Sequence, residues 1–327
     1  MKILLTGATG FVGSHILDSL RARGWNVRVL LRRSSNRQFI AKHLPDIEVS
    51  EGGIGDTESL VKAMDGVTHV IHCAGATKAR HNTEFDEINR IGTRNVVEAA
   101  NRHAGSISRF MLISSLAASH PATASAPARE DDPPSPVSEY GRSKLGGEQE
   151  VRERCQSPFT ILRPPAVFGP RDTEFLSTFR AVKRHLSPGF IGGVDTMSIV
   201  FVKDLAEAVA TCLTHHAAVG RTYFVASPDV VTVCGLGDEI AKQLNVWTLP
   251  LWLPVGLLWP VCAINEVLCR LVNKPSMLNR QKYRELSAPG WVCDTTRLKA
   301  EVGFVAPTPL PVAIQQTIGW YREKEML

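Results

Sequence analysis

The chain has 327 residues, of which 44% are hydrophobic and 21% charged, and a formal net charge of +5. This length and composition are typical of a globular protein with a sizeable core, and they exclude a peptide, a coiled coil and a disordered chain. Because the basic residues are not interleaved with aromatic ones and show no zinc-finger spacing, we expect no nucleic acid partner.

The cysteines and the first residues of the chain indicate the cellular compartment of the protein. The seven cysteines are odd in number and form no C-x-x-C pair, which argues against a disulfide framework and a zinc site, so no metal is predicted. The first apolar run is too short for a secretory signal. We therefore expect a cytoplasmic protein with reduced thiols.

Strands and helices are expected to alternate from the first residues onward. The predicted order is a strand over 2–6, a helix over 11–20, a strand over 27–31, a helix over 59–64, a strand over 67–73, a helix over 85–103 and a strand over 110–114. This alternation predicts an α/β fold of the Rossmann type, a doubly wound parallel sheet with helices on both faces.

The second half of the chain is less regular. A surface loop rich in Pro, Ala and Ser over 119–138 precedes a helix over 137–154 and a strand over 159–163. An amphipathic helix is predicted over 204–215. We expect a Rossmann domain for NAD(P) over 1–170. The remainder, 171–327, would be a smaller, interleaved lobe that mainly binds substrate, with about 196–226 returning to the Rossmann sheet.

A glycine turn follows the first predicted strand. Gly7 permits a sharp turn, Gly10 allows a pyrophosphate close to the backbone, and Gly13 allows close packing of helix and strand. The start of the following helix offers unpaired N–H groups and a partial positive charge to phosphates. The turn therefore predicts a dinucleotide site.

Arginines end the second predicted strand, where NAD-binding folds usually carry an acid for the ribose hydroxyl. Arg32 and Arg33 stand there instead. A guanidinium suits a 2′-phosphate, so NADP(H) is the preferred cofactor and NAD(H) the alternative. A solvated basic edge would explain the same residues.

Tyr140 and Lys144 lie four residues apart in a predicted helix, so both side chains project from the same face. An ammonium nearby favours phenolate, and we expect it to lower the pKa of Tyr140 from its usual value of about 10. Tyr140 could then act as a general acid or base. The ends of parallel strands would bring both residues to the same crevice as the glycine turn.

Several motifs in this order resemble the extended short-chain dehydrogenase/reductases, the NAD-dependent epimerase/dehydratase superfamily. The pattern is most similar to the 3β-hydroxysteroid dehydrogenase and dihydroflavonol reductase branches. The motifs are GATGFVG (7–13), HCAG (72–75), NRIGTRNVVEAA (89–100), ISS (113–115), YGRSK (140–144), RPPAVFGP (163–170) and IVFVKDLAEAV (199–209).

The resemblance implies a site made of Ser115, Tyr140 and Lys144. Ser115 would bind the substrate oxygen, Tyr140 would transfer the proton, and Lys144 would hold the nicotinamide ribose. Ser114 is the alternative hydroxyl, and Asn89 would support a water relay to Lys144 or kink its helix. The expected cofactor residues are Gly7, Thr9, Gly10, Phe11, Val12, Gly13, Arg32, Asp56, Ala74, Gly75, Tyr140, Lys144, Pro165 and Val167. Arg32 is expected from its place after the second predicted strand and not from the resemblance, and His72 is expected to be a packed residue.

Departures from the family pattern narrow the expected reaction. No acid follows Ser115, as dehydratases require, and Arg32 is unlike the acid of most epimerases. An oxidoreductase that interconverts an alcohol and a ketone remains. A nucleotide-sugar epimerase, for which Arg171 could supply a cation, and a non-catalytic cofactor-binding protein stay as alternatives.

An uncharged stretch over 246–264 bears on the substrate and on partners. It contains three tryptophans, and its three prolines argue against a membrane-spanning helix. It would form the wall of a hydrophobic substrate site, contact a membrane surface peripherally, or belong to the core of the second lobe. A bulky hydrophobic substrate of sterol, lipid or flavonol type is therefore expected. A homodimer is kept as an alternative for this protein.

Overall fold

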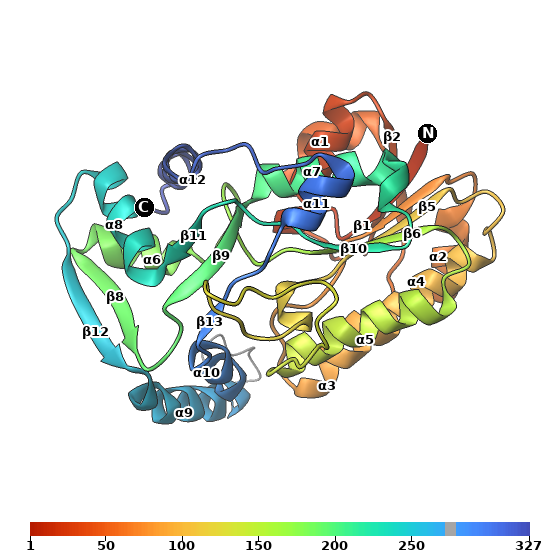
Figure 1. Ribbon diagram of the computed structural model, residues 1–327. Helices are drawn as coiled ribbons and strands as arrows, with labels where there is room; N and C mark the ends of the chain where they lie inside the picture. Colours follow the sequence, from red (N-terminus) through yellow and green to blue (C-terminus); the bar gives the residue numbers. More distant parts are fainter. Residues whose placement is uncertain (272–278) are drawn as a thin grey trace.

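The computed structural model describes residues 1–271 and 279–327, so 272–278 of the expected second lobe lie outside the described residues. Its main feature is a seven-stranded sheet (Figure 1). All neighbouring strands of this sheet are parallel, as the alternating pattern predicts. In spatial order they are β10 (Arg221–Phe224), β6 (Phe159–Arg163), β5 (Arg109–Ile113), β4 (His69–His72), β1 (Lys2–Thr6), β2 (Asn26–Leu31) and β3 (Glu48–Glu51).

Helices cover both faces of the sheet, which explains why its central strands bury apolar side chains on both faces (Figure 1). One face carries α1 (Phe11–Ala22), α7 (Val202–Thr214) and α11 (Thr296–Val302). The other carries α2 (Thr57–Met64), α4 (Gly92–Asn101) and α5 (Glu139–Arg154). Short helical turns complete this part: η1 (Gln38–Asp46), α3 (Asn82–Phe85), η2 (Asp86–Ile91), η3 (Leu116–Ala118) and η4 (His216–Ala218).

The helix expected over 85–103 is interrupted. Its first part is α3 followed by the π-helical turn η2, and only then does α4 begin. Thr93 donates its hydroxyl to the Asn89 carbonyl at 2.6 Å, and the Asn89 side chain is engaged elsewhere. Apolar spacing does not reveal such a turn, because a single π turn is too short to establish a period of its own.

The second lobe has its own sheet and core. β7 (Ala166–Phe168) and β13 (Gly290–Trp291) pair in parallel with β9 (Thr196–Phe201), whereas β11 (Val230–Thr232) is antiparallel to it. The core also includes α6 (Leu176–Lys183), α8 (Val233–Leu244) and α12 (Leu310–Glu323).

The segment over 196–226 only partly returns to the Rossmann sheet. β10 is the edge strand of that sheet and α7 packs on α1. β9 differs from the expectation, because it pairs with β7, β11 and β13 instead. A strand recognised by its apolar residues carries no information on which sheet it joins.

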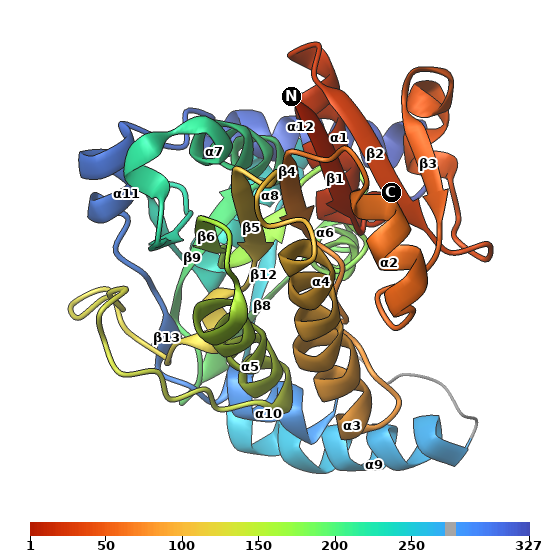
Figure 2. The same cartoon turned by 90° about the vertical axis from the view of Figure 1, so that its right-hand side faces the viewer.

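A two-stranded ribbon and two helices form the far edge of the second lobe. β8 (Leu186–Ile191) pairs in parallel with β12 (Leu249–Pro254), and η5 (Val255–Leu257) leads from β12 into α9 (Leu258–Leu271). Both views show α9 along the outer edge of the molecule, beside α10 (Arg280–Leu286) (Figures 1 and 2). Within 1–271 and 279–327, none of the helices combines the length and apolarity needed to cross a membrane.

Candidate active site

The glycine turn after β1 forms a cradle into which a dinucleotide fits. Gly7 has φ +75°, and a Cβ on Gly13 would lie 2.1 Å from the Gly7 carbonyl oxygen, so both positions require glycine. Gly10 is the N-cap of α1 and has no side chain to satisfy the first N–H groups, and the first turn of α1 has no acidic residue. These features fit a pyrophosphate.

A short loop after β4 connects this cradle with the predicted catalytic residues. A Cβ on Gly7 would lie 2.6 Å from the Ala74 nitrogen, so the loop packs directly on the turn. A Cβ on Gly75 would lie 3.5 Å from Lys144 Nζ and 3.0 Å from Asn89 Oδ1. The loop therefore brings the glycine turn and Lys144 to the same edge of the sheet.

The first turn of α5 holds Tyr140 beside Ser115. Ser138 caps the helix by accepting the Gly141 N–H at 3.1 Å. A Cβ on Gly141 would lie 2.2 Å from the Ala117 carbonyl oxygen, so only glycine allows this close approach of α5 to η3. Ser115 and Tyr140 share a side-chain hydrogen bond. The Tyr140 ring packs edge-on against the ring of Phe85, with 6.0 Å between the ring centroids.

The expected lowering of the Tyr140 pKa is wrong for the protein by itself. Desolvation by burial raises the pKa of Tyr140 to about 12, and the carboxylates of Glu285 and Glu174 act in the same direction. The hydrogen bond with Ser115 lowers it only in part. Tyr140 is therefore a neutral phenol near neutral pH, which equips it to donate a proton.

Lys144 is nearly buried, with an exposed fraction of 8%. Its ammonium donates to the Ile113 carbonyl oxygen at 2.7 Å. Desolvation by burial lowers the pKa of Lys144 to about 8, although the nearby Cys73 and Glu148 raise it. An ammonium has three donors, so two remain for a ligand at this edge of the sheet.

We expect Lys144→Met to stabilise the protein near neutral pH. The pKa of Lys144 falls from 10.5 to about 8 on folding. Below pH 8 this shift lowers the unfolding free energy of the wild type by about 3 kcal/mol. The variant regains this free energy but loses about 1 kcal/mol with the hydrogen bond to Ile113. Between pH 8 and 10.5 only the unfolded chain binds the proton, so the unfolding free energy of the wild type rises with pH through this window. The advantage of the variant should shrink accordingly.

Urea unfolding across this pH range measures the effect. Lys62→Met is the matched control, because Lys62 is exposed on α2, and it should show no such dependence within the window. A constant difference between wild type and Lys144→Met at every pH would contradict the expectation.

Ser114, the alternative hydroxyl, is engaged in a buried ionic network. It donates to Glu148 Oε1 at 2.6 Å. Glu148 also accepts two hydrogen bonds from the buried Arg163, at 2.8 and 2.7 Å, and one from Arg152 at 2.9 Å. Although desolvation opposes it, these partners lower the pKa of Glu148, so it is a carboxylate. This network favours Ser115 over Ser114 as the site hydroxyl.

Asn89 holds the active-site loop rather than contacting Lys144 by a hydrogen bond. Its side chain accepts the Ala76 N–H at 2.8 Å and donates to the Ala76 carbonyl at 3.0 Å. It also donates to Ser143 Oγ at 2.9 Å. Asn89 thereby joins the loop after β4 to α5, while its backbone forms the kink that was one of its two expected roles.

The predicted adenosine-side residues lie at the ends of β2 and β3. Arg32 is exposed, and its stem lies 3.7 Å from where a Cβ on Gly53 would be. Arg33 is 90% exposed and pairs with Glu51 at 3.0 Å. Asp56 caps α2 by accepting hydrogen bonds from the N–H groups of Glu58 and Ser59. This capping role explains an aspartate at this position without a contact to a cofactor.

Of the remaining predicted residues, Pro165 and Val167 lie at the carboxyl end of β6 and in β7, and the neighbouring Pro164 carbonyl accepts the Leu116 N–H at 2.8 Å. His72 is packed, as expected: it bonds Thr6 and Thr93, and burial lowers its pKa to about 3.

Arg171 is held by α1. Its guanidinium donates to Ser14 at 3.0 Å and forms an ion pair with Asp18 at 2.7 Å. This pairing leaves it poorly suited to the role of a cation for a sugar nucleotide. Within the described ranges, no group of three His, Cys, Asp or Glu side chains could hold a metal ion.

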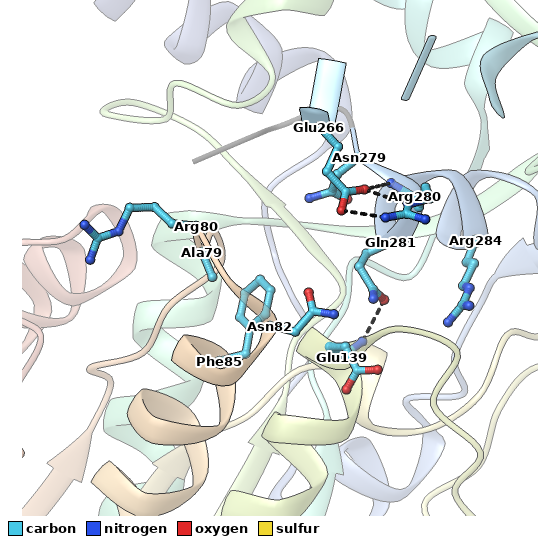
Figure 3. A pocket seen from close by; sticks show the side chains of 10 residues that line it. All are labelled: Ala79, Arg80, Asn82, Phe85, Glu139, Glu266, Asn279, Arg280, Gln281 and Arg284. Carbon is cyan, nitrogen blue, oxygen red and sulfur yellow. Dashed lines mark hydrogen bonds and ion pairs between the residues drawn. The ribbon is translucent and has the colours of Figure 1, made fainter. Parts of the chain in front are cut away.

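A cavity of about 290 Å³ lies between α3, the start of α5, α9 and α10 (Figure 3). Tyr140 itself is not among the residues that line it. Phe85, which packs on Tyr140, and Glu139, which precedes it, both line this cavity. Gln281 accepts the Glu139 N–H at 2.9 Å and thus ties α10 to the helix that carries Tyr140. Glu266 lines the cavity from α9.

Residues 3–226 match the model of the NAD dependent epimerase/dehydratase family. The match covers more than half of the chain and includes the cradle and every residue of the predicted catalytic group. The chain belongs to this family. It is thus an enzyme of the extended short-chain dehydrogenase/reductase type with an NAD-binding Rossmann fold.

Several known proteins are similar to this chain over nearly its whole length. It is 32% identical to the ceramide reductase of Caulobacter vibrioides over 98% of this chain and 94% of the relative. It is 28% identical to sterol demethylase protein B of Methylococcus capsulatus, with both chains covered completely. The crystal structure of gox2253 superimposes with a TM-score of 0.82 at 27% identity, covering 100% of this chain and 99% of that one.

Sequence reasoning missed residues that position the site without touching a ligand. A Cβ on Gly147 of α5 would lie 2.6 Å from the Asn89 carbonyl oxygen, so this glycine allows α5 to pack against η2. Gly141 has the corresponding role at η3. Three glycines within one predicted helix, at 141, 146 and 147, were the available signal, because glycine in a helix interior is destabilising without a packing reason.

Proposed function

We propose that this protein is an NADP(H)-preferring reductase that converts a ketone on a bulky lipid into an alcohol. The observation that carries the proposal is the meeting of Ser115, a protonated Tyr140 and Lys144 beside the glycine cradle. The reduced dinucleotide, when bound, supplies the hydride to the carbonyl carbon. Ser115 orients the carbonyl oxygen, and Tyr140 transfers its phenolic proton to that oxygen, so that an alcohol results.

The chain's own residues have distinct roles in this proposal. The first turn of α1 binds the pyrophosphate, Lys144 donates to the nicotinamide ribose, and Ala74, Gly75, Pro165 and Val167 line the cofactor. The neutral phenol of Tyr140 supports the reductive direction, because reduction of a carbonyl consumes a proton. The names of the two relatives, a ceramide reductase and a sterol-processing protein, support a lipid substrate.

Purified protein, NADPH and an oxidised ceramide that carries a ketone in its sphingoid chain provide the test. We expect loss of reduced-nicotinamide absorbance and a product heavier by two hydrogens. A parallel incubation of the protein with NADP⁺ and a cell lipid extract should yield lipids that are lighter by two hydrogens than those in the extract. Cofactor binding without turnover on any ketone of a broad lipid panel would contradict the proposal and favour a non-catalytic protein.

A nucleotide-sugar epimerase is the second candidate, because the family includes epimerases by name. The ion pair of Arg171 with Asp18 argues against it, since this cation is already held by α1. Thermal protection by UDP-glucose, together with tightly retained NAD in the purified protein, would favour the epimerase. We expect neither.

Arg32→Ala should weaken NADPH binding by about 10- to 100-fold, because a hydrogen bond to a charged phosphate contributes about 1.5–3 kcal/mol. NADH binding should change little, since NADH has no 2′-phosphate. Arg33→Ala is the matched control and should have a smaller effect, because Arg33 is paired with Glu51. Titration of both cofactors measures this, and a wild type that binds NADH more tightly than NADPH would refute the role of Arg32.

A further inference from the structure

The helix α9 is amphipathic in an unusual sense, because its apolar side faces outward. The side chains at positions 260, 261, 264, 267 and 268 recur at helical spacing, share one face and are all exposed and apolar, and Leu257 of the preceding η5 is exposed as well. Ile264 is 61% and Leu268 56% exposed. A helix on the surface of a globular protein ordinarily presents its polar side to water.

The polar side of α9 faces the protein instead. Glu266 forms an ion pair with Arg280 of α10 at 3.1 Å and lines the cavity between α3, α5 and α10 (Figure 3). Cys262 is 1% exposed. The burial of Cys262 and the ion pair of Glu266 with α10 therefore set the orientation of α9, and the apolar face is not an accident of a loosely packed helix.

The exposed apolar surface continues from α9 onto the ribbon of β8 and β12. Pro254, the last residue of β12, pairs with Ile191, which is 55% exposed, and η5 begins at the next residue. Trp252 on β12 is 50% exposed and Trp259 on α9 is 51% exposed. Most of the apolar side chains of 246–264 are therefore exposed and do not belong to the core of the second lobe, although Val246 packs on that core and Val255 and Cys262 are buried. We call the exposed side chains of Ile191, Trp252, Leu257, Trp259, Val261, Ile264, Val267 and Leu268 the apolar face.

Charge distribution distinguishes a lipid surface from other occupants. No charged residue lies within 246–265. The exposed Lys183 and Arg184 precede β8, the strand that ends at Ile191 of the apolar face, and the exposed Lys282 lies on α10, which packs against α9. Apolar side chains with tryptophans among them and basic residues at the rim are the pattern of a helix lying in the interface of a bilayer that contains anionic lipids.

We infer that the apolar face docks this protein on a lipid bilayer, with α9 lying in the plane of the interface. α9 then separates the bilayer from the cavity between α3, α5 and α10 by about 10 Å, the diameter of one helix. Docking does not depend on the proposed function. The consequence that a lipid substrate enters the cavity from the bilayer does rest on it.

Flotation of the full-length protein with vesicles tests the docking without any turnover. The probes are vesicles of phosphatidylcholine alone and of phosphatidylcholine with phosphatidylglycerol. The wild type should float with both, and more completely with the anionic vesicles. The triple variant Val261→Ser/Ile264→Ser/Leu268→Ser should lower the partition coefficient by about tenfold or more, because it removes apolar area from the membrane interface.

A matched control changes the same number of exposed apolar side chains elsewhere. Val219, Val305 and Val312 are 43%, 44% and 42% exposed, and their replacement by serine should leave flotation unchanged. Both triple variants should retain the melting temperature and NADPH binding of the wild type. Lys183→Gln/Arg184→Gln should remove only the part of the binding that depends on phosphatidylglycerol.

Two results would overturn the inference. One is a wild type that floats with neither vesicle. The other is a wild type that does not bind vesicles and has twice the mass of one chain in light scattering, while the Val261→Ser/Ile264→Ser/Leu268→Ser variant has the mass of one chain. This result would assign the apolar face to a second copy of the chain. A failed turnover assay with intact flotation would reject the proposed function and leave the docking in place.

Discussion

Tyr140→Phe should lower turnover by about 10²–10⁴-fold, the usual contribution of a positioned general acid. The change removes only the hydroxyl, and the ring that packs on Phe85 remains. NADPH affinity should therefore be nearly unchanged. Steady-state rates with the ketone substrate and a separate NADPH titration distinguish these two effects, and a variant that retains turnover would reject Tyr140 as the acid.

Tyr321→Phe is the matched control for this experiment. Tyr321 is fully buried in the core of the second lobe, and its hydroxyl has no hydrogen-bond partner among the described residues. Loss of this hydroxyl should leave turnover unchanged. If both variants lost activity equally, the effect of Tyr140→Phe would be a general one on folding.

Glu148→Ala should lower the unfolding free energy by about 3–5 kcal/mol, because it leaves the charge of Arg163 buried without its partner. Glu148 is fully buried, and Arg163 is 3% exposed. The variant also removes the acceptor of Ser114, which adds a smaller cost. Urea unfolding of the protein without ligands measures the difference.

Glu58→Ala on α2 is the control for Glu148→Ala. Glu58 pairs with Lys62 at 2.8 Å, and both side chains are exposed. Exposed pairs of this kind contribute less than about 1 kcal/mol. Similar losses in the two variants would show that the ionic network around Arg163 has no special role in stability.

The geometry of much of the candidate site could be predicted because its residues are close together along the chain. Gly7, Gly10 and Gly13 lie within one turn, and Tyr140 and Lys144 lie one helical turn apart, so spacing alone brings each group together. The strands over 2–6 and 159–163 have the predicted bounds because continuous apolar runs between polar turns are a strong local signal.

The choice between Ser114 and Ser115 could not be made in this way. The two residues are adjacent and have the same side chain. The preference for Ser115 comes from Glu148, 34 residues further along the chain, which binds the hydroxyl of Ser114. The sign of the Tyr140 pKa shift was likewise wrong at first, because the spacing of Lys144 is visible in the sequence and the desolvation of the phenol is not.

The amino-acid sequence by itself determined the alternating sheet, the glycine turn after β1 and the pair on α5, since each depends on residues that are close along the chain. Only the tertiary structure decided whether Ser114 or Ser115 has its hydroxyl available to the site, in which direction the pKa of Tyr140 shifts and which side of α9 faces outward. These properties depend on burial and on partners distant in sequence, and an apolar stretch such as 246–264 has the same composition whether it lies in a core or on a surface.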